Sequence, residues 1–132
     1  MALKFKVVER GEPGVTGGGT KKYYATTVSS GETTLDSLTD LIEESSTVSG
    51  ADIRAVLYAM VSMTTKALAN GQIVRLGDLG SLRMGISSEG AELADDVNAG
   101  KIKGVKTIFT PGPRLKDTMK VMKFEKISVP SR

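Results

Sequence analysis

Apolar and polar residues alternate near the start of the chain, and this alternation predicts a pair of β-strands. Residues 3–10 alternate for most of their length, while residues 21–28 are rich in aromatic and β-branched side chains. Residues 11–20 between them contain five glycines and a proline, so we expect a mobile loop there. The two strands can therefore form a hairpin with a long connection.

Two helices are predicted next, because apolar residues recur there at every third or fourth position. Thr33 or Thr34 can cap the first helix, which should end near Ser46. Ser49 can cap the second, and Asn70-Gly71 should end it. The second helix has a stripe of large apolar residues and a second edge of Ala55, Ala59 and Met63. Cover on two sides is expected for such a helix, and either a dimer core or the core of a lone domain would supply it.

The last sixty residues predict strands, a turn and a short helix. Residues 72–77 and 81–87 are strands around a tight segment at 77–80, and residues 105–110 form a third. Residues 88–104 are polar and small. The turn Pro111-Gly112-Pro113 leads into a helix over 114–122, and residues 124–129 alternate as a final strand. The predicted order is β-β-α-α-β-β-β-α-β, an α+β fold.

The composition excludes several classes of protein. The chain has the size of one ordinary domain with 132 residues, and it has no cysteine and no histidine. Without these residues the usual general base and the commonest metal ligands are missing, so we expect no enzyme, cofactor, metal site or small-molecule substrate. We interpret the Asp95-Asp96 pair as part of a solvated loop. No apolar run is long enough to span a membrane and no secretory signal is visible, so no membrane contact is expected.

Charge is unevenly distributed along the chain. Residues 31–52 hold six acids and no base, whereas residues 101–126 hold eight bases against two acids. A basic C-terminal third is what an anionic partner such as nucleic acid requires. A solvated lysine face explains the same pattern equally well.

Three motifs between residues 34 and 123 resemble the HU/IHF family of bacterial histone-like proteins. The first is the helix pair with Ser49 as the second cap. The second is the segment 74–82, Val-Arg-Leu-Gly-Asp-Leu-Gly-Ser-Leu, which is similar to that family's strand–turn–strand. The third is the segment 109–117, Phe-Thr-Pro-Gly-Pro-Arg-Leu-Lys-Asp, which resembles the family's approach to its last helix. The resemblance implies an intertwined homodimer with a two-helix base, a β-sheet, an extended β-arm that embraces DNA, and a short C-terminal helix.

The first thirty residues lie outside those motifs. A strand-rich leader before an HU-like core resembles the divergent HU-like proteins of Bacteroides and its relatives. We therefore predict an N-terminal β extension at residues 1–30, an HU-like DNA-binding domain at 31–126 and a tail at 127–132.

The predicted arm departs from the family pattern. The family's arm is rich in arginine and lysine and ends in a proline that wedges between base pairs. Here residues 83–104 contain three bases against four acids, and no proline lies between Gly31 and Thr110. Strong kinking of DNA is therefore not expected.

The resemblance and the charge pattern together predict non-sequence-specific binding to double-stranded DNA, in an architectural protein of the cytoplasmic nucleoid. An alternative is an HU-fold dimer that has lost DNA binding and whose acidic arm contacts another protein. Phosphates are bound by cations placed along a groove. The candidate contacts on the arm and the last helix are Arg83, Lys101, Lys103, Lys106, Arg114, Lys116 and Lys120.

Overall fold

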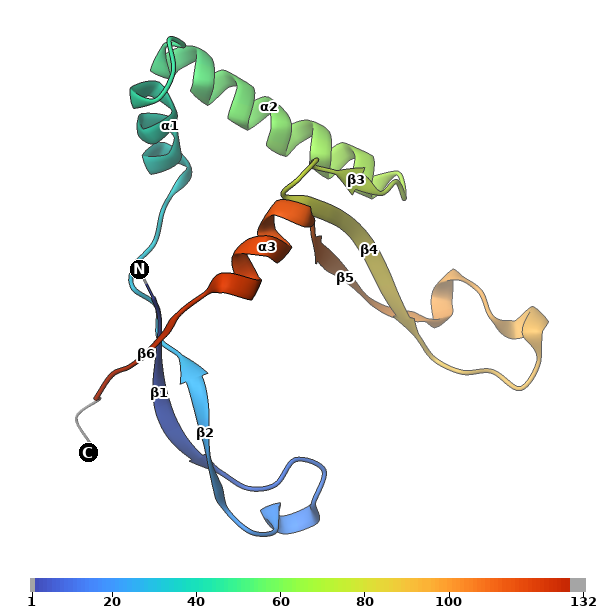
Figure 1. Cartoon of the computed structure of the whole chain (residues 1–132). Helices are drawn as coiled ribbons and strands as arrows, with labels where there is room; N and C mark the ends of the chain where they lie inside the picture. The colour runs from blue at the N-terminus through green and yellow to red at the C-terminus, as the bar shows by residue number, and fades with distance from the viewer. Residues whose placement is uncertain (1, 129–132) are drawn as a thin grey trace. The chain divides into compact units, whose positions relative to one another are not determined.

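The computed structural model describes residues 2–128, which form two compact units. One unit combines the chain up to Thr33 with the part that follows Met119, and the other spans Thr34–Met119. Figure 1 labels the elements of both units. Their order along the chain is β-β-α-α-β-β-β-α-β apart from three short 3-10 turns, which confirms the predicted α+β order.

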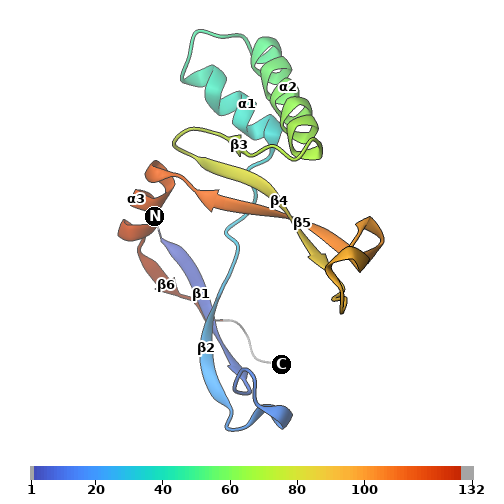
Figure 2. The ribbon, with the colours of Figure 1, turned by 90° about the vertical axis from the view of Figure 1, so that its right-hand side faces the viewer.

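The first unit is a three-stranded sheet in the order β2-β1-β6. Strand β1 (Leu3–Arg10) pairs antiparallel with β2 (Lys22–Thr27) and parallel with β6 (Phe124–Lys126). The predicted hairpin is therefore confirmed, although β6 ends earlier than the predicted strand 124–129, whose last residue lies outside the described part of the chain. Figure 2 shows β6 lying beside β1.

A compact turn closes the connection between β1 and β2. It contains the 3-10 turn Thr16–Gly18, and the amide of Glu12 donates to the carbonyl oxygen of Gly18 at 2.5 Å. An ion pair of 3.7 Å joins Lys22 Nζ to Glu12 Oε1 beside it. The mobility expected for this loop stays a prediction.

The second unit begins with a helical hairpin, visible in Figure 2. Thr34 caps α1 (Leu35–Glu44) by accepting the amide of Ser37, and Ser49 caps α2 (Gly50–Ala69) by accepting the amide of Asp52. Asn70 follows α2, and Gly71 has a φ of 77°, a conformation that glycine adopts without strain. The predicted helices and their caps are thus confirmed, with α1 ending slightly earlier than expected.

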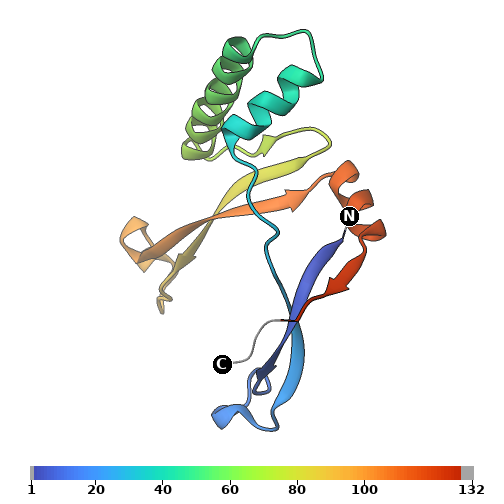
Figure 3. The same cartoon turned by 90° about the vertical axis from the view of Figure 1, so that its left-hand side faces the viewer.

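A second sheet, β3-β4-β5, follows the helices. Strand β3 is only Val74–Arg75, whereas β4 (Gly80–Ser88) and β5 (Ile102–Pro111) form a long antiparallel ribbon. The prediction that the third strand of this sheet starts at residue 105 was wrong, because β5 begins at Ile102. The segment 102–104 looked like a loop because it is polar and contains a glycine, but its backbone continues the ladder opposite Ser87 and Ser88. Figure 3 shows the ribbon ending in a curled loop.

The start of the last helix packs tightly against the turn before β4. The amide of Gly112 donates to the carbonyl oxygen of Leu79 at 2.9 Å, just before α3 (Pro113–Val121) begins. A Cβ on Gly112 would lie 2.7 Å from the carbonyl carbon of Asp78, closer than real Cβ atoms approach. A glycine is therefore required there, which explains the Pro-Gly-Pro sequence physically.

Few side chains are buried within the described residues of this single chain. Ile53 and Leu68 on α2 are buried, together with Thr39 on α1, whose hydroxyl donates to the carbonyl oxygen of Leu35 at 2.9 Å. Several large apolar residues of α2 remain exposed, among them Val56 at 66% and Met63 at 61%. The apolar surface of the helices is thus larger than one chain covers.

Candidate nucleic-acid interface

The register of the second sheet gathers cations on one face. In an antiparallel ladder, residues opposite each other project from the same face. Arg83 lies opposite Ile108, Lys106 lies opposite Gly85, and Arg75 lies opposite Ser81. These positions share one face, which we call the basic face and define as Arg75, Arg83 and Lys106. All three side chains are exposed.

Gly85 leaves space at the centre of the basic face. A Cβ built there would lie 2.8 Å from Ile108 Cδ1 and 3.5 Å from Lys106 Cε. The side chains of Ile108 and Lys106 therefore reach across the ribbon over the glycine. The aliphatic stem of Lys106 rests on the ribbon, and the residue remains exposed as a whole. The ammonium group is thus available to a partner lying on this face.

The opposite face of the ribbon is apolar. Its cross-strand pairs are Leu82 with Phe109, Met84 with Thr107 and Ile86 with Val105. The Thr107 hydroxyl lies 3.4 Å from Met84 Sδ, in agreement with that register. The ribbon therefore has one cationic and one apolar face, so an anionic ligand would contact only the first.

Lys101 and Lys103 lie nearer the tip of the arm, outside the regular ladder. Lys103 falls at the irregularity beyond the pair Ser87–Gly104, and Lys101 ends the 3-10 turn Ala99–Lys101. The carbonyl oxygen of Lys101 accepts the amide of Glu89 at 2.7 Å, and this bond closes the tip loop. The loop also carries exposed acids, which are Glu89, Glu92, Asp95 and Asp96. The structure thus separates the acidic tip from the basic face.

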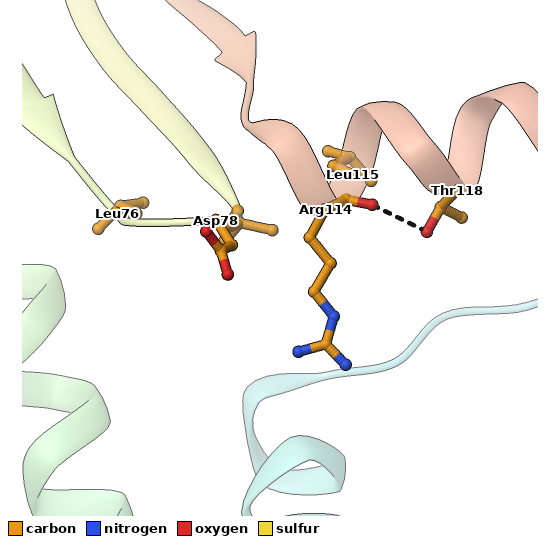
Figure 4. A pocket seen from close by; sticks show the side chains of 6 residues that line it. Leu76, Asp78, Arg114, Leu115 and Thr118 are labelled. Atoms are coloured by element: carbon orange, nitrogen blue, oxygen red, sulfur yellow. Dashed lines mark hydrogen bonds between the residues drawn. The ribbon is translucent and has the colours of Figure 1, made fainter.

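The three predicted residues of α3 do not share one side of the helix. Lys116 and Lys120 are four residues apart and lie one above the other. Arg114 instead lines a shallow depression of about 390 Å³ together with Asp78 and Leu115. Figure 4 shows Arg114 and Asp78 at this depression, with the Thr118 hydroxyl donating to the carbonyl oxygen of Arg114 at 3.1 Å. Because an acid shares the depression, it attracts an anion less strongly than the basic face does.

Arg75 was missed by the sequence reasoning. Its guanidinium Nη1 donates to the Ser81 hydroxyl at 3.4 Å, which turns the side chain toward the basic face. The predicted strand 72–77 contains Arg75. However, its face could be known only from the pairing of that strand with the strand that carries Arg83. Within residues 2–128 no three acidic residues lie close enough together to hold a metal ion. No helix of that part is long and apolar enough to cross a membrane.

Comparison with known proteins identifies the family of this chain. A family model described as HU-HIG, an "HU domain fused to wHTH, Ig, or Glycine-rich motif", matches residues 1–126. The chain belongs to the HU-HIG family. The match includes the N-terminal sheet as well as the helices and the ribbon, so the HU-HIG pattern extends over both units. Such HU-like DNA-binding families are generally non-enzymatic.

A solved structure supports the fold assignment. A candidate DNA-binding protein from Bacteroides vulgatus ATCC 8482 matches with a TM-score of 0.61 and 18% sequence identity. The alignment covers 96% of this chain but only 48% of that protein, so the chain spans about half of its length. Among curated proteins, the comparison found no significant match.

Proposed function

We propose that this HU-like chain binds double-stranded DNA without sequence specificity, through the basic face of its ribbon. The observation that carries the proposal is the placement of Arg75, Arg83 and Lys106 on one face while the other face is apolar. DNA phosphates form a dense line of negative charge, and cations along a ribbon bind that line regardless of the bases. Membership of an HU family supports the same ligand.

Further contacts would come from the arm and the last helix. Lys101 and Lys103 lie beside the ribbon's outer end, and Lys116 and Lys120 share one side of α3. Arg114 is a weaker candidate because Asp78 shares its depression. In this proposal residues 31–126 form the DNA-binding part, with residues 1–30 as an extension and 127–132 as a tail.

The proposed assembly is a homodimer. Val56, Met60 and Met63 recur on one side of α2 and are 66%, 45% and 61% exposed. A contiguous apolar stripe of this kind is unfavourable in water and is typical of a protein–protein interface. A second copy of α2 would cover it, as the HU resemblance implies. The proposed role is an architectural protein of the cytoplasmic nucleoid.

A protein-interaction module is the alternative, and the arm tip is the observation that favours it. Four exposed acids lie there beside Leu93 and Val97, which are 65% and 53% exposed. Acidic and apolar groups together would suit a basic protein surface rather than phosphates.

A band-shift titration of the full chain separates the two functions. We expect duplexes of unrelated sequence to be shifted at similar protein concentrations, and the shift to weaken strongly when the salt concentration is raised. An absence of any shift at low salt would instead leave the protein-interaction module as the function.

A further inference from the structure

The N-terminal sheet also separates its charges by face. Lys4, Lys6 and Arg10 alternate along β1, and Lys22 lies opposite Arg10 on β2. Thr26, opposite Lys6, and Tyr24, opposite Val8, add hydroxyl groups to the same face. Glu125, opposite Lys4, is its one acid among the paired residues of the three described strands. We call this face, with its four cations, the leader face.

The reverse side of the sheet carries most of its large apolar residues. Leu3, Phe5, Ala25 and Phe124 line a groove of about 430 Å³ there. The charged residues of the three strands on that side are Glu9 and Lys126, whose charges cancel. The cations of β1 and β2 are therefore gathered on one face rather than scattered around a solvated strand pair.

This arrangement of cations has an energetic cost. Arg10 and Lys22 are directly opposite each other, and like charges in that position destabilise a strand pair. An ion pair with Glu12 offsets part of this repulsion, since Lys22 Nζ lies 3.7 Å from Glu12 Oε1. Within residues 2–128 no acidic oxygen lies within ion-pair distance of Lys4, Lys6 or Arg10. An external anion would remove the repulsion.

Arg10 and Lys22 on the leader face are exposed and Lys4 and Lys6 are half-buried, and the length of this row of cations suits a long polyanion. Alternate residues of a strand are about 6.7 Å apart, so Lys4 and Arg10 are separated by about 20 Å. Duplex DNA carries about one negative charge per 1.7 Å of its axis, so a row of this length faces several phosphates. Hydroxyl groups such as those of Thr26 and Tyr24 also donate to phosphate oxygens.

We infer that the leader face is a second site for the phosphate backbone of double-stranded DNA, separate from the basic face of the ribbon. The inference rests on the proposed function for the identity of the ligand. Each chain would then contact DNA through both of its units.

Two pairs of matched variants of the full chain test this site. Glu125→Gln removes the acid from the leader face, and Glu9→Gln removes an acid from the reverse side. Lys4→Gln with Lys6→Gln removes two cations from the face. The control for this variant is Lys21→Gln with Lys126→Gln, which makes the same change in net charge. Lys21 precedes β2, and Lys126 lies on the reverse side of the sheet. Affinity for a long duplex is measured as a function of salt concentration, and circular dichroism verifies the fold.

We expect Glu125→Gln to tighten binding and Glu9→Gln to leave it unchanged. The Lys4/Lys6 variant should reduce the slope of log affinity against log salt by about 0.9 for each phosphate that is no longer neutralised, or nearly two units. The Lys21/Lys126 variant should keep the wild-type slope. Because Glu125→Gln is expected to increase affinity, a misfolded lysine variant cannot imitate the full pattern.

Other outcomes overturn the inference in distinguishable ways. One such outcome is a wild-type affinity in Glu125→Gln together with a wild-type slope in the Lys4/Lys6 variant. If replacing Lys106 still weakened binding, this result would leave the proposed function intact and remove the second site. A full chain that binds no duplex would remove both. If the Lys4/Lys6 variant instead loses self-association in light scattering with an unchanged DNA slope, the leader face binds the acidic arm of another copy.

Discussion

Lys106 lies directly across the ribbon from Gly85 and diagonally from Arg83. Diagonal neighbours on one face of an antiparallel pair are about 7–8 Å apart, so two cations are held close together. No acid of the β3-β4-β5 ladder shares that face. The arrangement is unfavourable in a free protein and favourable against a row of phosphates, which is why the proposed function centres on it.

The acids of the arm tip should oppose DNA binding. Replacing Asp95 and Asp96 by asparagine should tighten binding, because the repulsion between carboxylates and nearby phosphates is removed. The gain should shrink as salt rises, since screening acts over about 10 Å at 0.1 M. Asp40→Asn with Glu44→Gln on α1 is the control with the same change in net charge. Equal gains in both variants would show that only net charge matters and that the tip does not approach DNA.

The bound duplex should be bent only slightly. Opening a base step costs a few kcal/mol, and the tip carries no proline to hold a step open. Energy transfer between dyes at the two duplex ends should therefore change little on binding. Leu93→Ala and Val97→Ala should leave the signal unchanged. A large bend that disappears in either variant would show that an exposed apolar side chain of the tip acts as the wedge.

The apolar stripe of α2 should make folding depend on dimerisation. The melting temperature should rise with protein concentration, as it does when a folded state exists only as a dimer. Val56→Asp should lower the melting temperature strongly. Val105→Asp on the ribbon is the matched control, because its side chain is 65% exposed against 66% for Val56. Equal effects of the two substitutions, or a stable monomer in light scattering, would contradict the proposed dimer.

The junction between the turn and α3 should not tolerate a side chain at residue 112. Gly112→Ala places a Cβ against the backbone of Asp78, and overpacking of this kind costs about 1–3 kcal/mol of the free energy of unfolding. Gly90→Ala, where a Cβ would meet nothing within 4 Å, should change that free energy by less than about 0.5 kcal/mol. Urea denaturation of both variants measures the difference.

Local patterns of the sequence were sufficient to predict most of the elements. The caps Thr34 and Ser49 and the stop at Asn70-Gly71 depend on neighbouring residues alone, and the structure confirms them. The start of β5 at Ile102 was missed because cross-strand pairing, a non-local interaction, fixes it. Candidate cations could be named from composition and resemblance, but their grouping depends on register. Arg75 shares a face with Arg83 and Lys106 because it pairs with Ser81. Ser81 lies on the same face of β4 as Arg83, and Lys106 reaches that face by pairing with Gly85.

The most direct test of the central claim is the salt dependence of duplex binding by Lys106→Gln. Lys66→Gln on α2 makes the same chemical change away from the ribbon and serves as the control. For two duplexes of unrelated sequence, we predict equal affinities and a slope of log affinity against log salt that falls by about 0.9 in Lys106→Gln alone. A slope unchanged from wild type in Lys106→Gln, or a marked preference for one of the two sequences, would contradict non-specific phosphate binding by the basic face.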